Sequence, residues 1–86
     1  MPELCRFYGI VIRMFPNDHG PPHFHAAYSG DQATVEIDTL FVRNGRLPRR
    51  AENLVAEWAA LHRDELLEAW NRSQRRQPPG RIAPLD

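Results

Sequence analysis

Three of the four histidines of this chain lie within seven residues, in the segment Asn17-Asp18-His19-Gly20-Pro21-Pro22-His23-Phe24-His25. Imidazole rings bind divalent metal ions, and they also transfer protons near neutral pH. The same segment contains one carboxylate and two adjacent prolines, which stiffen the backbone between the histidines. We therefore treat residues 17–25 as the first candidate for a functional site.

The first chemistry that fits this segment is metal binding. Nitrogen from His19, His23 and His25, with a carboxylate oxygen from Glu36 or Asp38, is a donor set that suits zinc or a similar divalent ion. The His-x-His pattern alone is a weak signature, because any two strand residues on one face produce it.

The second chemistry that fits the segment is general acid–base catalysis. The sequence does not decide between this chemistry and metal binding. Here His19, His23 and His25, supported by Asp18, would move protons to and from the 2′-hydroxyl of RNA without a metal. Carboxylates beside the rings favour their charged form.

Four arginines form a basic stretch that contains no acidic residue: Arg43, Arg46, Arg49 and Arg50. Two of them follow Pro48, where a helix is predicted to begin, and cations at that end oppose the helix dipole. A residue placed where the helix dipole disfavours its charge can mark a functional site. The free backbone N–H groups at the start of a helix also bind phosphate. We predict that these four arginines hold the phosphates of a substrate.

The histidines must be positioned by strands. The stretch from Cys5 to Phe15 is β-branched and aromatic, and both of its alternating sets are apolar, which predicts one central strand. Residues 23–28 and 32–37 predict a hairpin with Gly30-Asp31 as its loop. In that register His25 lies opposite Glu36 and His23 lies opposite Asp38, so all four would share one face of the sheet.

The second half of the chain predicts helices. Asn44-Gly45 is typical of a type I′ turn and would close a second short hairpin. After Pro48, apolar residues recur at spacings of three and four, which is the period of an amphipathic helix, either one long helix or two short ones. The prolines and glycine of residues 77–86 predict an extended or disordered tail. The fold class predicted is α+β: a small, mainly antiparallel sheet of three to five strands with the helical half packed on one face.

Length and composition narrow the class of protein. The 86 residues predict a single domain, residues 1–76, of marginal size, to which homo-oligomer formation would add stability. A formal net charge of zero argues against a general nucleic-acid binder. One cysteine allows no internal disulfide, and no apolar run approaches the ~20 residues of a membrane span, so we expect a cytoplasmic protein without a membrane partner.

The chain resembles a family of small bacterial proteins classed as a domain of unknown function. The resemblance rests mainly on Asn17-Asp18-His19-x-Pro21-Pro22-His23-x-His25, and it extends through Glu57-Trp58-Ala59-x-Leu61-His62-Arg63 and Glu65-Leu66-Leu67-Glu68-x-Trp70. Genes of this family often stand beside a gene for a second small protein, in an arrangement like a toxin–antitoxin pair. The resemblance implies a toxin-like component with a small protein partner, and it carries over no catalytic residue.

Three functions follow as hypotheses. The first is a toxin-like enzyme that cleaves RNA with the histidine and carboxylate cluster. The second is a non-enzymatic interaction module whose histidine loop docks the partner protein. The third is a structural or sensing domain that binds a divalent metal such as zinc through the same histidines.

Overall fold

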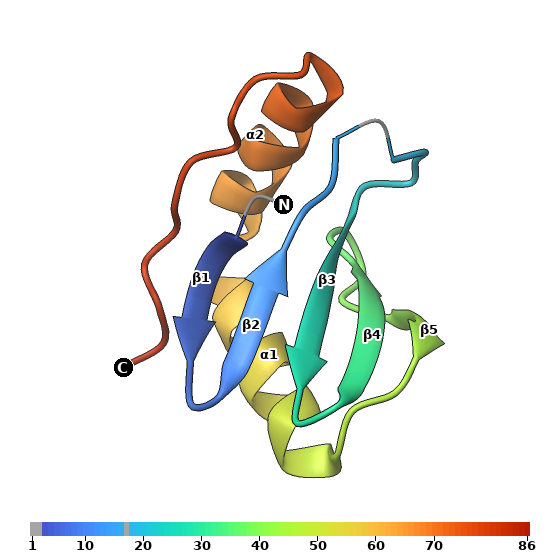
Figure 1. Cartoon of the computed structure of the whole chain (residues 1–86), viewed down its shortest axis with the longest axis vertical. Helices are drawn as coiled ribbons and strands as arrows, with labels where there is room; N and C mark the ends of the chain where they lie inside the picture. Colours follow the sequence, from blue (N-terminus) through green and yellow to red (C-terminus); the bar gives the residue numbers. More distant parts are fainter. Residues whose placement is uncertain (1–2, 17) are drawn as a thin grey trace.

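The computed structural model describes residues 3–16 and 18–86, and Asn17 of the histidine segment lies outside the described residues. A five-stranded sheet is followed by two helices, which confirms the predicted α+β class (Figure 1). The strands are antiparallel and lie side by side in chain order: β1 Glu3–Phe7, β2 Ile10–Arg13, β3 His23–Tyr28, β4 Asp31–Glu36 and β5 Val42–Gly45.

The first apolar stretch is two strands, so the prediction of one strand from Cys5 to Phe15 is wrong. Tyr8 and Gly9 both have positive φ, +50° and +81°, and they turn the chain back on itself between β1 and β2. Two successive positive φ values match the right-handed twist of a hairpin. Tyrosine is an uncommon residue at such a position, which is why the sequence pattern did not reveal the turn.

The β3–β4 hairpin exists, but its predicted register is wrong by two residues. Its loop is Ser29-Gly30, and Asp31 already pairs with Tyr28. A shift of two keeps every side chain on its predicted face but changes its partner. His23 therefore lies opposite Glu36, and His25 lies opposite Thr34 rather than a carboxylate.

The predicted turn at Asn44-Gly45 is also wrong, because both residues belong to β5. That strand pairs with β4, with Thr34 opposite Asn44 and Ala33 opposite Gly45. Gly45 has a φ of +76°, and a Cβ built on it would meet the backbone oxygen of Gln32 at 2.2 Å. Glycine is needed at this position because β4 and β5 approach each other closely, and not because it forms a hairpin loop.

Gly45→Ala is expected to lower the free energy of unfolding by about 2–3 kcal/mol, because the left-handed backbone strain adds to a collision with backbone that cannot move aside. Gly30→Ala is the matched control, since Gly30 has a φ of +90° but open space around its Cβ position. Urea denaturation of both variants measures the difference. Equal losses in the two would show that the collision at Gly45 contributes nothing.

The helices are α1 Arg49–Leu61 and α2 Arg63–Gln74, so the chain has two short helices rather than one long one. His62 leaves the helical conformation between them, with φ −118° and ψ 25°. Asp64 and Glu65 then fall in the first turn of α2, where carboxylates favour a new helix start. Trp58 of α1 is fully buried against Phe7 and Phe24 of the sheet.

Residues 77–86 run extended beside β1 (Figure 1). The Ile82 side chain is buried in the core, and its backbone N–H donates to the Leu4 carbonyl at 3.0 Å. The indole N–H of Trp58 donates to the Ala83 carbonyl at 2.8 Å. The tail therefore covers the outer edge of the sheet and completes the surroundings of Trp58.

No helix within residues 3–16 and 18–86 has the length and apolar character needed to cross a membrane.

Candidate functional site

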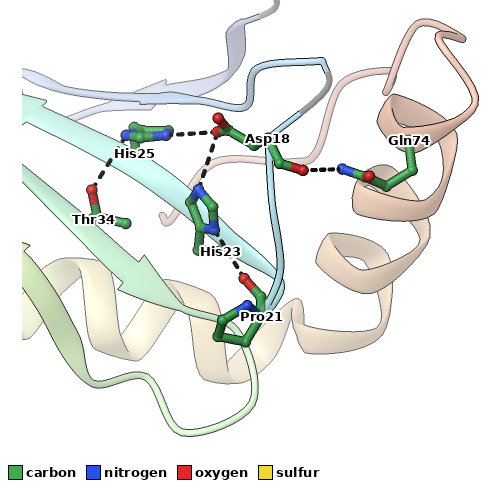
Figure 2. Close-up of polar contacts among 6 residues, drawn as sticks. All are labelled: Asp18, Pro21, His23, His25, Thr34 and Gln74. Atoms are coloured by element: carbon green, nitrogen blue, oxygen red, sulfur yellow. Dashed lines mark hydrogen bonds and ion pairs between the residues drawn. The ribbon is translucent and has the colours of Figure 1, made fainter.

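Asp18, His23 and His25 converge at the end of the sheet where β3 begins (Figure 2). The two histidines are two positions apart on β3, so their rings share one face of the strand, with centroids 5.2 Å apart. Asp18 approaches from the loop that precedes β3. One donor atom from each of the three residues lies within 4.8 Å of the others.

His23 is held in one orientation. Its Nδ1 donates to the Pro21 carbonyl at 2.9 Å, and its ring packs on Trp70 of α2 with a centroid distance of 5.0 Å. Only 4% of the residue is exposed. Because a carbonyl oxygen can only accept, the proton of a neutral His23 ring must be on Nδ1, which leaves a lone pair on Nε2.

That Nε2 atom lies 3.1 Å from Oδ2 of Asp18, and His25 Nε2 lies 3.2 Å from the same oxygen. His25 can donate its Nε2 proton to the carboxylate. A neutral His23 cannot, because its proton is already used on Pro21. The His23–Asp18 contact therefore requires either a second proton on the His23 ring or a cation shared by the two atoms.

Asp18 is anchored through its backbone. Its carbonyl accepts a hydrogen bond from Nε2 of Gln74, at the end of α2, at 2.9 Å. Burial by itself raises the pKa of the Asp18 carboxyl, but the close contacts with His25 and His23 lower the pKa further than burial raises it. The net pKa lies below its ordinary value, so the carboxylate is charged at neutral pH.

His25 is the more accessible of the two rings, with 29% of its side chain exposed. Its Nδ1 lies 3.5 Å from the Thr34 hydroxyl, a long contact from the neighbouring strand, and Phe15 meets the ring edge-on at a centroid distance of 4.6 Å. With 33% of the Asp18 side chain also exposed, the cluster opens to solvent on the side of these two residues.

The other residues of the predicted cluster lie apart from these three. His19 is exposed in the loop, outside the group of converging donor atoms. Glu36 lies opposite His23 in the register, but its Oε1 accepts from the Thr39 hydroxyl at 3.4 Å. Asp38 is exposed in the turn after β4, because that strand already ends at Glu36.

The four predicted phosphate-binding arginines are also separated from the cluster. Arg43 and Arg46 are exposed on and just after the edge strand β5. Arg49 and Arg50 form the first turn of α1, which begins at the end of the molecule opposite the loop of Asp18 (Figure 1). There they line a groove with Asn53, Leu54 and Glu57.

Sequence reasoning missed several residues that position or border the site. Gln74 and Trp70 belong to α2, some fifty positions away in the chain, and no local pattern connects them to the loop. Thr34 follows only from the true register of β4. Arg13 carried a signal, since a charged side chain within an apolar strand must reach a polar region, and it lies opposite His25 on β2.

Two uses fit this geometry. An oxygen and two imidazole nitrogens converging from a rigid strand and an anchored loop form a three-donor set for a divalent ion. A carboxylate between two imidazoles also forms a proton-carrying pair. Among the described residues, the site combines one buried ring, one accessible ring and one charged carboxylate.

The comparisons with known proteins give one result. No curated protein and no solved structure matches the chain. A family model described as a domain of unknown function (DUF4160) matches residues 9–71, which include β2 to β5, α1, most of α2 and the whole of the Asp18, His23 and His25 cluster. This chain therefore belongs to the DUF4160 family, a domain of unknown function.

Proposed function

We propose that this chain binds a divalent metal ion, zinc by the character of its donors, through Asp18, His23 and His25. One observation carries the proposal: the hydrogen bond from His23 Nδ1 to Pro21 leaves a lone pair on Nε2 that faces the Asp18 oxygen at 3.1 Å. A metal-bound histidine almost always donates its other ring N–H to a carbonyl or carboxylate in this way.

Two of the three separations between the donor atoms fit a shared ion. Zinc binds nitrogen and oxygen at about 2.0–2.2 Å, so two neighbouring donors of a tetrahedral site lie about 3.3 Å apart. The distances from Asp18 Oδ2 to His23 Nε2 and His25 Nε2 are 3.1 and 3.2 Å.

Three protein donors leave a fourth zinc position for water, the arrangement of catalytic rather than structural zinc sites. The solvent-exposed side of Asp18 and His25 is where that position would lie. Zinc lowers the pKa of bound water to about 7. In hydrolysis of a phosphodiester, the water oxygen bonds to phosphorus while the leaving oxygen departs with a proton. We propose RNA as the substrate and a toxin-like role beside a small protein partner, in keeping with the family resemblance.

The test measures zinc content and its consequences on the purified protein. We expect one zinc per chain by elemental analysis. Zinc at 100 times its Kd stabilises the folded state by about 2.7 kcal/mol, so a chelator should lower Tm by about 10–20 °C. Expression of the wild type should arrest bacterial growth, and His25→Asn should relieve the arrest.

His19→Ala is the control variant, because His19 is exposed and outside the converging group. It should keep its zinc and its growth arrest. A wild-type protein that takes up no zinc, and whose Tm responds neither to zinc nor to chelator, would refute the metal proposal.

A second candidate is RNA cleavage by proton transfer without a metal. The observation that favours it is the direct hydrogen bond from His25 to Asp18, which orients an accessible ring with a charged carboxylate behind it. The chelator separates the two candidates, since cleavage of RNA by histidines alone would continue in its presence and cleavage by zinc-bound water would stop.

A further inference from the structure

A row of polar side chains crosses the face of the sheet that carries the cluster. The register places Arg13 of β2, His25 of β3, Thr34 of β4 and Asn44 of β5 opposite one another. Directly opposed residues of antiparallel strands have Cβ atoms about 4.5–5.5 Å apart on one face. The row therefore passes through one of the proposed metal-binding residues and extends on both sides of it.

On one side of His25 the row presents a cation. Arg13 is partly buried, and within the described part of the chain no hydrogen bond or ion pair joins its guanidinium to a carboxylate. Glu3 lies opposite it, but the Glu3 carboxylate is bonded to Arg6 at 2.9 Å. A guanidinium presents a planar fork of N–H donors that matches two phosphate oxygens.

On the other side of His25 the surface is hollowed. A depression of about 190 Å³ is lined by His25, Gln32, Thr34 and Asn44, together with Ala33 and Gly45. One hydroxyl and two amide side chains both donate and accept hydrogen bonds, which is the chemistry that recognises sugar hydroxyls. The hollow has room for a single sugar and none for a double helix.

We propose that this face binds single-stranded RNA, with a phosphate on Arg13 and the proposed metal ion, and the adjacent ribose in the hollow beside Thr34 and Asn44. This inference rests on the proposed function and adds which residues beside the metal site would hold the phosphate and the ribose of the RNA. Recognition of the 2′-hydroxyl would distinguish RNA from DNA there. The polar row supplies both requirements, a charge for the phosphate and hydrogen-bonding groups for the sugar.

The test uses zinc-loaded full-length protein and two fluorescein-labelled probes, a ten-nucleotide oligouridylate and the matching oligothymidylate, both with cleavage-resistant phosphorothioate links. Fluorescence anisotropy gives the Kd of each, and elemental analysis gives the zinc content of every variant. We expect the RNA probe to bind more tightly than the DNA probe. Arg13→Gln should weaken both about tenfold, as expected when one charge-assisted phosphate contact is lost. Asn44→Ala should weaken binding of the RNA probe and leave the Kd of the DNA probe unchanged.

The comparison variant is Arg49→Gln/Arg50→Gln, which removes two cations at the opposite end of the molecule and should change either Kd less than twofold. Loss of binding in that variant, but not in Arg13→Gln, would overturn the proposal and place the phosphate at the start of α1. Wild-type protein with full zinc and no affinity for either probe would overturn it while leaving the metal site standing. Absence of zinc would instead refute the proposed function.

Discussion

Asp18→Asn is expected to weaken zinc binding at least about 100-fold, since even the loss of a group that only supports a metal-binding residue costs 10–100-fold. The asparagine side chain has nearly the same shape, so the loop can keep the hydrogen bond from Gln74 to the backbone of residue 18. What is lost is the negative charge that His23 and His25 face. Isothermal titration with zinc into metal-free protein measures the change.

Glu36→Gln is the matched control for that prediction. The sequence predicts Glu36 or Asp38 as the carboxylate of a metal site and gives Asp18 a supporting catalytic role, but the Glu36 carboxylate accepts from the Thr39 hydroxyl. The Glu36 variant should bind zinc within twofold of the wild type. If the two variants lost affinity equally, the donor set would include Glu36 and the cluster drawn in Figure 2 would be incomplete.

The second large effect is expected from removal of residues 78–86. A chain that ends at Gln77 loses the buried Ile82 side chain and leaves the Trp58 indole N–H without the Ala83 carbonyl. Loss of a buried aliphatic side chain and an orphaned buried donor together should lower the free energy of unfolding by about 3 kcal/mol or more. For a domain of this size, Tm should fall by at least about 10 °C.

Arg81→Ala in the full-length chain is the control for the truncation. The Arg81 side chain is 69% exposed, and its contact with Glu3 is a loose one at 3.7 Å, so the substitution should change stability by less than about 0.5 kcal/mol. Ile82→Ala should fall between the two. Urea denaturation followed by tryptophan fluorescence compares all three, and a truncated chain as stable as the full one would show that the tail does not pack on Trp58.

The sequence by itself determined which residue types meet at the site and which face of each strand they occupy. Alternation along residues 23–28 placed His23 and His25 on one face, and the spacing of apolar residues after Pro48 predicted the helical half. These predictions succeed because they depend on the side-chain repeat of 2 residues in a strand and 3.6 residues in a helix, which are properties of the local backbone. A register shift of two residues does not disturb them.

Only the tertiary structure decided which groups complete the site. The turns at Tyr8-Gly9 and Ser29-Gly30 each place a non-glycine residue at positive φ, which no sequence pattern indicated. The Ser29-Gly30 turn sets the register that puts Thr34 rather than Glu36 opposite His25. The lone pair of His23 depends on a backbone carbonyl, and the position of Asp18 depends on a helix far along the chain. Hydrogen bonds to backbone atoms and contacts between distant residues leave no pattern of residue types in the sequence. The sequence therefore indicated the segment, and only the tertiary structure determined which of its donor atoms face one another.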